Sequence, residues 1–218
     1  MTTVILASSS PRRKELMALT GWQVILRAVK VDEAPLPHEP AGSVAHRLAV
    51  AKARLAAEQG GQGEIVLAAD TVVAEADRIL GKPLDQAEAH RMLRDLRARS
   101  HQVITALMVI GDGQEAIEIC ETTVPMRDYG TKEVSEYIAT GSPLDKAGAY
   151  GIQDRGFDPV DVEKMEGCFA NVMGLPLCHL VRAMHRLGQT PETDVPLACQ
   201  AHTGYDCPVY SEILRGVA

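Results

Sequence analysis

The sequence lacks the features that mark several large classes of protein. It has no surplus of basic residues, because 22 Lys and Arg face 29 Asp and Glu and the formal net charge is -7. A protein that coats nucleic acid needs a basic surface, so that function is excluded. No apolar run approaches the roughly 20 residues needed to cross a bilayer, and no basic leader is present. We therefore expect a cytoplasmic protein with no membrane partner.

The cysteines do not form a recognisable framework. Five cysteines at irregular spacing are an odd number, which argues against a set of disulfides and fits a reducing compartment. Three of them, Cys120, Cys168 and Cys178, lie in apolar contexts and are predicted to be core residues. The chain has no internal repeat. With 46% hydrophobic and 23% charged residues over 218 positions, it has the composition of a folded globular protein.

Apolar strands alternate with helical stretches along the chain. The hairpin signal Gly111-Asp112-Gly113 separates two long apolar segments, so at least one strand pair is antiparallel. Asp85 and Glu88 form a predicted capping box at the start of a helix. This order predicts a mixed α/β fold and argues against a purely parallel doubly wound sheet. The predicted strands are 4–7, 22–29, 65–69, 103–110 and 116–126, and the clearest helices are 43–58, 131–139 and 177–187.

The first thirteen residues contain a strand, a hydroxyl-rich turn and a helix start. After the apolar run Val4–Ala7, Ser10 is a natural N-cap and Pro11 occupies the first helical position. Free backbone N–H groups, serine hydroxyls and two guanidinium groups then converge within the segment Ser8–Arg13. This combination suits a phosphate chain. The alternative is an ordinary capped helix with two solvated arginines.

Carboxylates and cations follow the predicted strands. Asp70 comes directly after a short apolar strand, where a carboxylate usually projects into a crevice. The pair Asp32-Glu33 ends the second predicted strand, Lys52 lies on the following helix, and Lys82 lies in a Gly-Lys-Pro turn. Oxygen ligands that hold Mg²⁺ or Mn²⁺, together with cations that neutralise phosphates, are what metal-assisted phosphoryl chemistry requires. Taken singly, each of these residues could be a surface charge.

Six short motifs stand out along the chain: Ser8–Arg13, Val31–Glu33, Ala69–Val72, Gly81–Pro83, Asp145–Gln153 and Asn171–Pro176. In this order and spacing they resemble the motifs of the Maf proteins over about residues 3 to 188. The resemblance implies a nucleoside triphosphate pyrophosphatase that uses a divalent metal to cleave between the α and β phosphates. It also implies a mixed, twisted sheet with flanking helices, two lobes around a central cleft as in inosine triphosphatases, and a homodimer.

The resemblance also assigns roles to residues. Asp70 is expected to be the general base that activates water or a metal ligand, and Glu33 a second ligand or an orienting carboxylate. Arg13, Lys52 and Lys82 are expected to bind phosphates and stabilise charge on the departing pyrophosphate. The hydroxyls of Ser8 and Ser10 and the nearby N–H groups would cradle the phosphate chain. The chain has no Walker motif G-x-x-x-x-G-K-[ST], which weakens a kinase or ATPase interpretation.

Three positions divide this family by substrate. Members that act on dTTP and UTP are similar to this chain at Arg12, Thr71 and Gln153, whereas members that act on 7-methyl-GTP carry Trp, Gln and Glu there. The Gln153 amide can donate and accept, which suits a pyrimidine edge. Alternatively, Gln153 is a loop residue with backbone contacts only. Two other functions stay open: a nucleotide-binding regulator of septum formation, and a pyrophosphatase for modified or purine triphosphates.

The tail is the part that departs from the family. We predict a nucleotide pyrophosphatase domain over residues 1–188 and a C-terminal extension of unknown role over residues 189–218. Cys199, His202 and Cys207 are a conceivable set of three zinc or iron ligands, although a fourth ligand is missing and the spacing fits no standard finger. The alternative is that the tail packs on the body or on a partner subunit.

Overall fold

The structure is a computed structural model that describes residues 2–61, 63–76 and 78–216. Within these residues, six strands form one mixed sheet in the order β2-β1-β3-β5-β6, and β4 pairs with the far end of β3. β1 is parallel to β2 and β3, while β5 and β6 form an antiparallel hairpin beside β3. The strands are β1 Thr3–Leu6, β2 Gln23–Leu26, β3 Ile65–Glu75, β4 Arg78–Leu80, β5 Ser100–Gly111 and β6 Gln114–Pro125.

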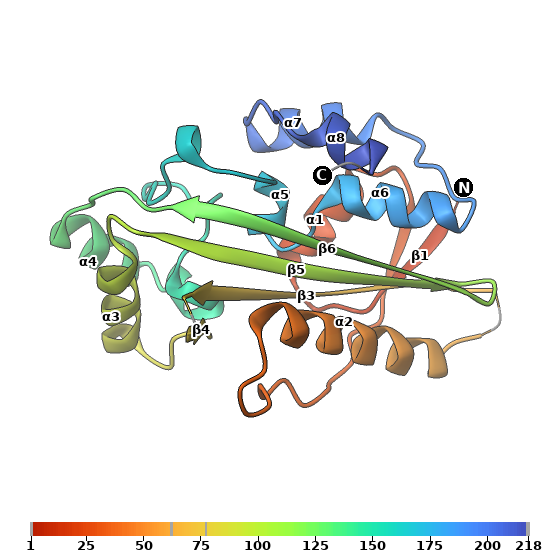
Figure 1. Cartoon of the computed structure of the whole chain (residues 1–218), viewed down its shortest axis with the longest axis horizontal. Coiled ribbons are helices and arrows are strands. Elements are labelled where there is room, and N and C mark those ends of the chain that lie inside the picture. Colours follow the sequence, from red (N-terminus) through yellow and green to blue (C-terminus); the bar gives the residue numbers. More distant parts are fainter. Residues whose placement is uncertain (1, 62, 77, 217–218) are drawn as a thin grey trace.

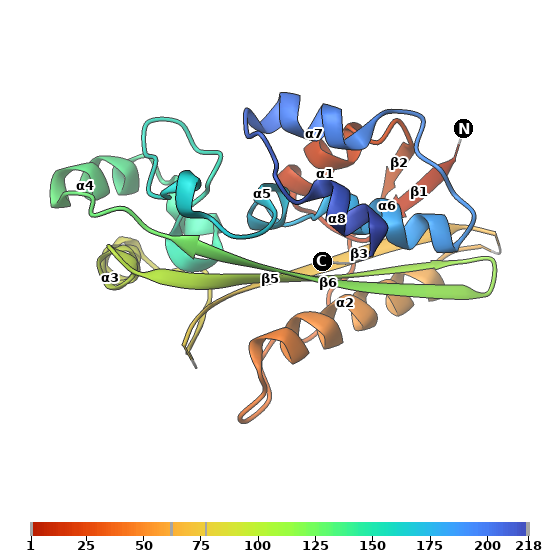
Figure 2. The ribbon, with the colours of Figure 1, turned by 45° about the horizontal axis from the view of Figure 1, so that its top comes forward.

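Helices cover both faces of the sheet, in agreement with the flanking helices that the family resemblance implied (Figure 1). α2 packs on one face, whereas α1, α6, α7 and α8 lie over the other (Figure 2). α3 and α4 lie at the open end of the β5–β6 hairpin, away from its turn (Figure 2). No helix of the described chain is long and apolar enough to cross a membrane. The α-helices are α1 Pro11–Ala18, α2 Ala41–Glu58, α3 Gln86–Leu96, α4 Thr131–Ala139, α5 Phe169–Val172, α6 Leu177–Arg186, α7 Val195–Thr203 and α8 Tyr210–Arg215.

The molecule has two lobes that share the long strands β3, β5 and β6 (Figure 1). In the larger lobe, alternate residues of β1 and β3 enter two apolar clusters, one under α2 and one under α1 and α6. In the smaller lobe, Leu93, Tyr129 and Ile138 form a separate core between the hairpin, α3 and α4. The mixed α/β fold with flanking helices is therefore confirmed.

β3 does not end at Asp70 as predicted. It continues to Glu75, because β5 pairs with it from Val66 to Ala74 and supplies ladder hydrogen bonds to a residue of low β-propensity. On the other side of β3, β1 pairs only as far as Leu67, and β4 begins pairing only at Val73. Asp70 therefore lies where one edge of β3 has no neighbouring strand. This gap, and not a strand end, creates the crevice.

The predicted second strand, 22–29, was too long. β2 is an edge strand and pairs with the four residues of β1 only, so it ends at Leu26. Asp32 and Glu33 consequently lie in the irregular segment between β2 and α2 and do not end a strand. This irregular segment brings Glu33 next to α2, where its carboxylate contacts Lys52.

Several local predictions were confirmed. Ser10 caps α1, Pro11 is its first residue, and α4 has the predicted bounds. Asp85 caps α3 by accepting from the Glu88 N–H at 2.7 Å. The reciprocal half of the predicted capping box was wrong, because the Glu88 carboxylate accepts from the N–H of Leu84, one residue before the cap.

Candidate active site

A cleft of about 570 Å³ lies between the two lobes, a size typical of sites for small organic ligands. It is lined by the start of α1, the segment before α2, the middle of β3, the turn after β4 and the segment 145–153. Every residue for which the sequence predicted a role in the site lines this cleft. These residues are Ser8, Ser10, Arg12, Arg13, Glu33, Lys52, Asp70, Thr71, Lys82 and Gln153.

A lysine joins two carboxylates in the cleft. Lys52, on the buried face of α2, places its Nζ 2.6 Å from Asp70 Oδ1 and 2.5 Å from Glu33 Oε1. The Lys52 and Asp70 side chains are each 11% exposed, whereas that of Glu33 is 64% exposed. The lysine therefore compensates a carboxylate that would be costly to bury alone.

The two carboxylates differ in their acidity. Burial raises the pKa of Asp70, although the nearby ammonium of Lys52 opposes this effect. The hydrogen bond from Lys52 lowers the pKa of Glu33, and the charges of Lys52, Lys82 and Arg13 add to the lowering. Environments that push two carboxyl pKa values apart are typical of sites in which one group moves a proton and the other stays charged.

Arg13 lies at the start of α1, beside the cleft, and hydrogen bonds fix its backbone and its side chain. The Ser10 hydroxyl accepts from the Arg13 N–H, which caps the helix, and the Ser8 hydroxyl accepts from the Ser10 N–H at 3.2 Å. The Arg13 guanidinium donates to Gly174 O at 2.8 Å and to Thr71 Oγ1 at 3.0 Å. Gly174 has a φ of +106°, which other residues rarely adopt. The loop before α6 thus orients the guanidinium of Arg13, for which the sequence predicted a role in phosphate binding.

Thr71 contacts Arg13 within the described residues. Asp70 and Thr71 are consecutive in β3, so they point to opposite faces of the sheet. Asp70 meets α2, whereas Thr71 shares a 2.9 Å hydrogen bond with Thr105 and accepts from Arg13. The predicted role of Thr71 in base choice would therefore act through the position of Arg13 or require these bonds to rearrange.

The other end of the cleft is a chain of charged contacts. Arg12 pairs with Asp145 at 3.0 Å, and Asp145 pairs with Lys146 at 2.7 Å. Gln153 donates from Nε2 to Asp154 Oδ1 at 3.2 Å, so its side chain does more than make backbone contacts. Asp145 and Lys146 belong to one of the sequence motifs, but no role was predicted for either residue. The signal available in the sequence was the adjacent pair Asp145-Lys146, with Asp154 a short distance further along the chain.

Lys82 stands apart from these networks. It is exposed in the turn after β4, and no ion pair of Lys82 occurs among the described residues. Its charge nevertheless reaches Glu33 and helps to lower the pKa of that carboxyl. The turn therefore places an ammonium group that has no ion pair among the described residues on the side of the cleft where Glu33 lies.

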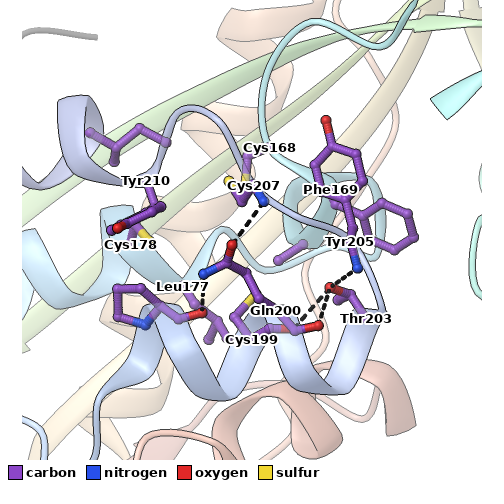
Figure 3. Close-up of a pocket in the computed structure, with 13 residues that line it drawn as sticks. Cys168, Phe169, Leu177, Cys178, Cys199, Gln200, Thr203, Tyr205, Cys207 and Tyr210 are labelled. Atoms are coloured by element: carbon purple, nitrogen blue, oxygen red, sulfur yellow. Dashed lines mark hydrogen bonds between the residues drawn. The ribbon is translucent and has the colours of Figure 1, made fainter. Parts of the chain in front are cut away.

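A second, smaller pocket lies under the C-terminal extension (Figure 3). Cys168, Cys178, Cys199 and Cys207 line it together with apolar side chains, in a space of about 20 Å³. His202 is exposed and does not line it. In the described part of the chain, no group of three or more His, Cys, Asp and Glu side chains could hold a metal ion. The three-ligand interpretation of the tail is therefore not supported.

These thiols belong to the packing of the tail. Burial raises the pKa of Cys199 to about 12 and also raises the pKa values of Cys178 and Cys207, which keeps them in the unreactive protonated form. Val195 of α7 and Ile213 of α8 are buried in the same apolar cluster as α6. The extension thus packs on the body of the larger lobe, and its cysteines fill the contact.

The fold and the cleft define an α/β protein suited to an anionic, phosphate-bearing ligand. A family model described as "Maf-like protein" matches residues 3–187, and the chain belongs to this family. It is 43% identical over 191 residues to a dTTP/UTP pyrophosphatase of Pasteurella multocida (strain Pm70), covering 84% of this chain and 94% of that protein. It is 41% identical over 213 residues to a dTTP/UTP pyrophosphatase of Thermomicrobium roseum (strain ATCC 27502 / DSM 5159 / P-2), covering 95% and 94%.

Among solved structures, a HAM1 protein from Coxiella burnetii is similar to this protein. The match covers 73% of this chain and 81% of that chain. The TM-score is 0.44 and the sequence identity is 19%.

Proposed function

We propose that this protein hydrolyses dTTP and UTP to the nucleoside monophosphate and pyrophosphate. The observation that carries the proposal is Lys52 shared by Asp70 and Glu33 in a cleft that also contains the capped start of α1 and Arg13. Membership of the Maf-like family and the dTTP/UTP pyrophosphatases among its relatives support the choice of substrate. The triphosphate would lie with its phosphates near α1 and its base near Gln153.

Asp70 is the general base in this proposal. Its raised pKa makes it a better proton acceptor than an exposed aspartate, and Lys52 holds only Oδ1 among the described residues. Oδ2 is therefore available to take the proton of a water molecule that attacks the α-phosphorus. The bond from that phosphorus to the bridging oxygen breaks, and pyrophosphate leaves. Arg13 and Lys82 stabilise the charge that develops on it.

The carboxylates also fit a divalent cation. Mg²⁺ and Mn²⁺ prefer oxygen ligands, and Mg²⁺ is usually bound through one or two carboxylates together with substrate phosphates. Asp70 and Glu33 supply two such groups, already gathered around one positive charge at Lys52. They would hold the ion, which polarises phosphate oxygens when bound. Glu33, whose pKa is lowered, stays ionised for this role.

Hydrolysis in ¹⁸O-labelled water tests the reaction and its regiochemistry. We expect pyrophosphate release with dTTP and UTP, the label in the monophosphate, and kcat/KM at least about tenfold above the values for ATP, GTP and 7-methyl-GTP. Label in pyrophosphate would place the attack on the β-phosphorus and would contradict the proposed geometry. A preference for 7-methyl-GTP or another purine triphosphate would overturn the assignment of substrate.

A further inference from the structure

Asp154 stands behind the wall of the cleft at its base end. Gln153 lines the cleft and Asp154 does not, yet the Gln153 amide donates to Asp154 Oδ1 at 3.2 Å. The other oxygen of this carboxylate, Oδ2, accepts from the Tyr137 hydroxyl at 2.6 Å and from the Ser142 hydroxyl at 2.7 Å. Lys146 Nζ lies 3.3 Å from Oδ2. Oδ2 is therefore held by three groups, while Oδ1 faces the amide.

The surroundings prevent this carboxylate from moving. Its side chain is only 13% exposed, and that of Lys146 is 8% exposed. Gly151 packs so closely against Asp154 that an added Cβ would lie 2.7 Å from Oδ1. The Tyr137 hydroxyl also accepts from the Gly151 N–H at 3.1 Å, which fixes the backbone beside the carboxylate. Asp154 is thus a rigid acceptor.

A rigid carboxylate determines which way the Gln153 amide faces. A carboxylate has acceptors and no donor, so only the NH₂ group of the amide can face it. If the amide turned over, its oxygen would face the negative Oδ1, which is repulsive. The opposite end of the amide, Oε1, has no hydrogen bond among the described residues. Gln153 therefore offers the cleft a fixed acceptor and the second N–H of its amide.

We propose that Asp154 is a positioning residue that selects uracil and thymine over cytosine by fixing the Gln153 amide. This inference rests on the proposed function. Uracil and thymine carry an N3–H donor between two carbonyl oxygens, whereas cytosine carries an N3 acceptor beside an N4 amine. An amide in the fixed orientation complements the first edge and opposes both groups of the second. A freely turning amide would match either base.

The variant Asp154→Asn tests the role directly. Asparagine can present either its oxygen or its NH₂ group to Gln153, so both orientations of the amide become acceptable. We expect the ratio of kcat/KM for UTP to that for CTP to be at least about 100 in the parent and to fall at least about tenfold in the variant. The smaller Asp154→Ala is the second variant in case Asp154→Asn does not fold.

Asp128→Asn is the matched control, because it makes the same change at a carboxylate that is 79% exposed and lies outside this network. We expect an unchanged UTP/CTP ratio. A folded Asp154 variant whose ratio stays within about threefold of the parent overturns the proposal, as does an Asp128→Asn ratio that falls equally. Parent enzyme that hydrolyses CTP within about threefold of UTP overturns it without any variant. Absence of UTP hydrolysis by the parent would instead refute the proposed function, so the two failures are distinguishable.

Discussion

The two ends of the cleft are built differently. At the phosphate end, Lys52 bridges two carboxylates and Lys82 has no ion pair among the described residues. At the base end, Lys146, Asp154 and their partners form a network whose polar groups are bonded to one another. At the phosphate end, charged atoms are available to bind a ligand, whereas at the base end the side chains have little freedom to move. We infer that the chemical step depends on charged atoms that can still bind a ligand, whereas selectivity for the base depends on side chains that are held in place.

The largest effect should come from the phosphate end. Asp70→Asn keeps the shape of the side chain and removes the proton acceptor, so we expect kcat for UTP to fall at least about a thousandfold with an unchanged fold. Steady-state pyrophosphate release and circular dichroism measure the two properties. Asp128→Asn, at a carboxylate that is 79% exposed in the other lobe, is the control. A loss of less than about tenfold would mean that Asp70 is not an essential base or ligand.

Lys52→Met should reveal the coupling between the cation and the base. Lys52 lowers the pKa of Asp70 against the effect of burial, so removing the ammonium raises that pKa further. A larger fraction of Asp70 is then protonated at any given pH, and the acid limb of kcat/KM must move to higher pH. We also expect about a hundredfold loss at the optimum. The matched control is Lys132→Met, because Lys132 is 89% exposed. If the acid limb does not shift, the group that titrates in the pH profile of kcat/KM is not Asp70.

Arg13→Ala should weaken the handling of the triphosphate. The variant loses a charge-assisted donor that Gly174 and Thr71 orient in the parent, and we expect kcat/KM for UTP to fall about 10- to 100-fold. Arg94→Ala, at a side chain that is 69% exposed, controls for loss of a surface charge. An unchanged kcat/KM would mean that Arg13 only connects α1 to Thr71 and the loop before α6, and does not contact the phosphates.

Gln153→Glu should act on the base end alone. A glutamate would place a second carboxylate beside Asp154 and could not donate to a carbonyl oxygen, so we expect about a tenfold fall in kcat/KM for UTP. The basal rate on purine triphosphates should change less. Gln114→Glu, at the exposed first residue of β6, is the control. An equal loss on every triphosphate would assign Gln153 a structural role.

The smallest effect concerns the segment that carries Glu33. Arg47 donates to Glu39 at 2.7 Å and to Ala34 O at 3.1 Å, and its hydrogen bond to Glu39 lowers the pKa of that carboxyl to about 2. A depressed pKa contributes stability above the unfolded pKa, and this is lost as pH falls through the folded value. Glu39→Gln should therefore lower Tm slightly at pH 7, with the difference shrinking from about pH 4.5 toward pH 2. A constant difference across this range would exclude the ion pair.

The sequence was most informative where structure is local. The cap at Ser10, the hairpin around Gly111-Asp112-Gly113 and the bounds of α4 follow from interactions between residues a few positions apart. The set of residues that line the cleft also came from the sequence, through motifs that were recognised as a group. The extent of β3 was predicted wrongly, because its continuation past Asp70 depends on pairing with β5, which is distant in sequence.

The mixed α/β class, the capped helix beside the first strand and the residue types available for phosphate chemistry all follow from the order of residues along the chain. In contrast, the folded chain was needed to show that Asp70 lies in a gap between two strands, that one lysine joins Asp70 to Glu33, and that Asp154 orients Gln153. The two groups of features depend on interactions of different range. Caps and turns are set by nearby backbone groups, whereas burial, pKa and the direction of an amide depend on neighbours that only the folded chain brings together.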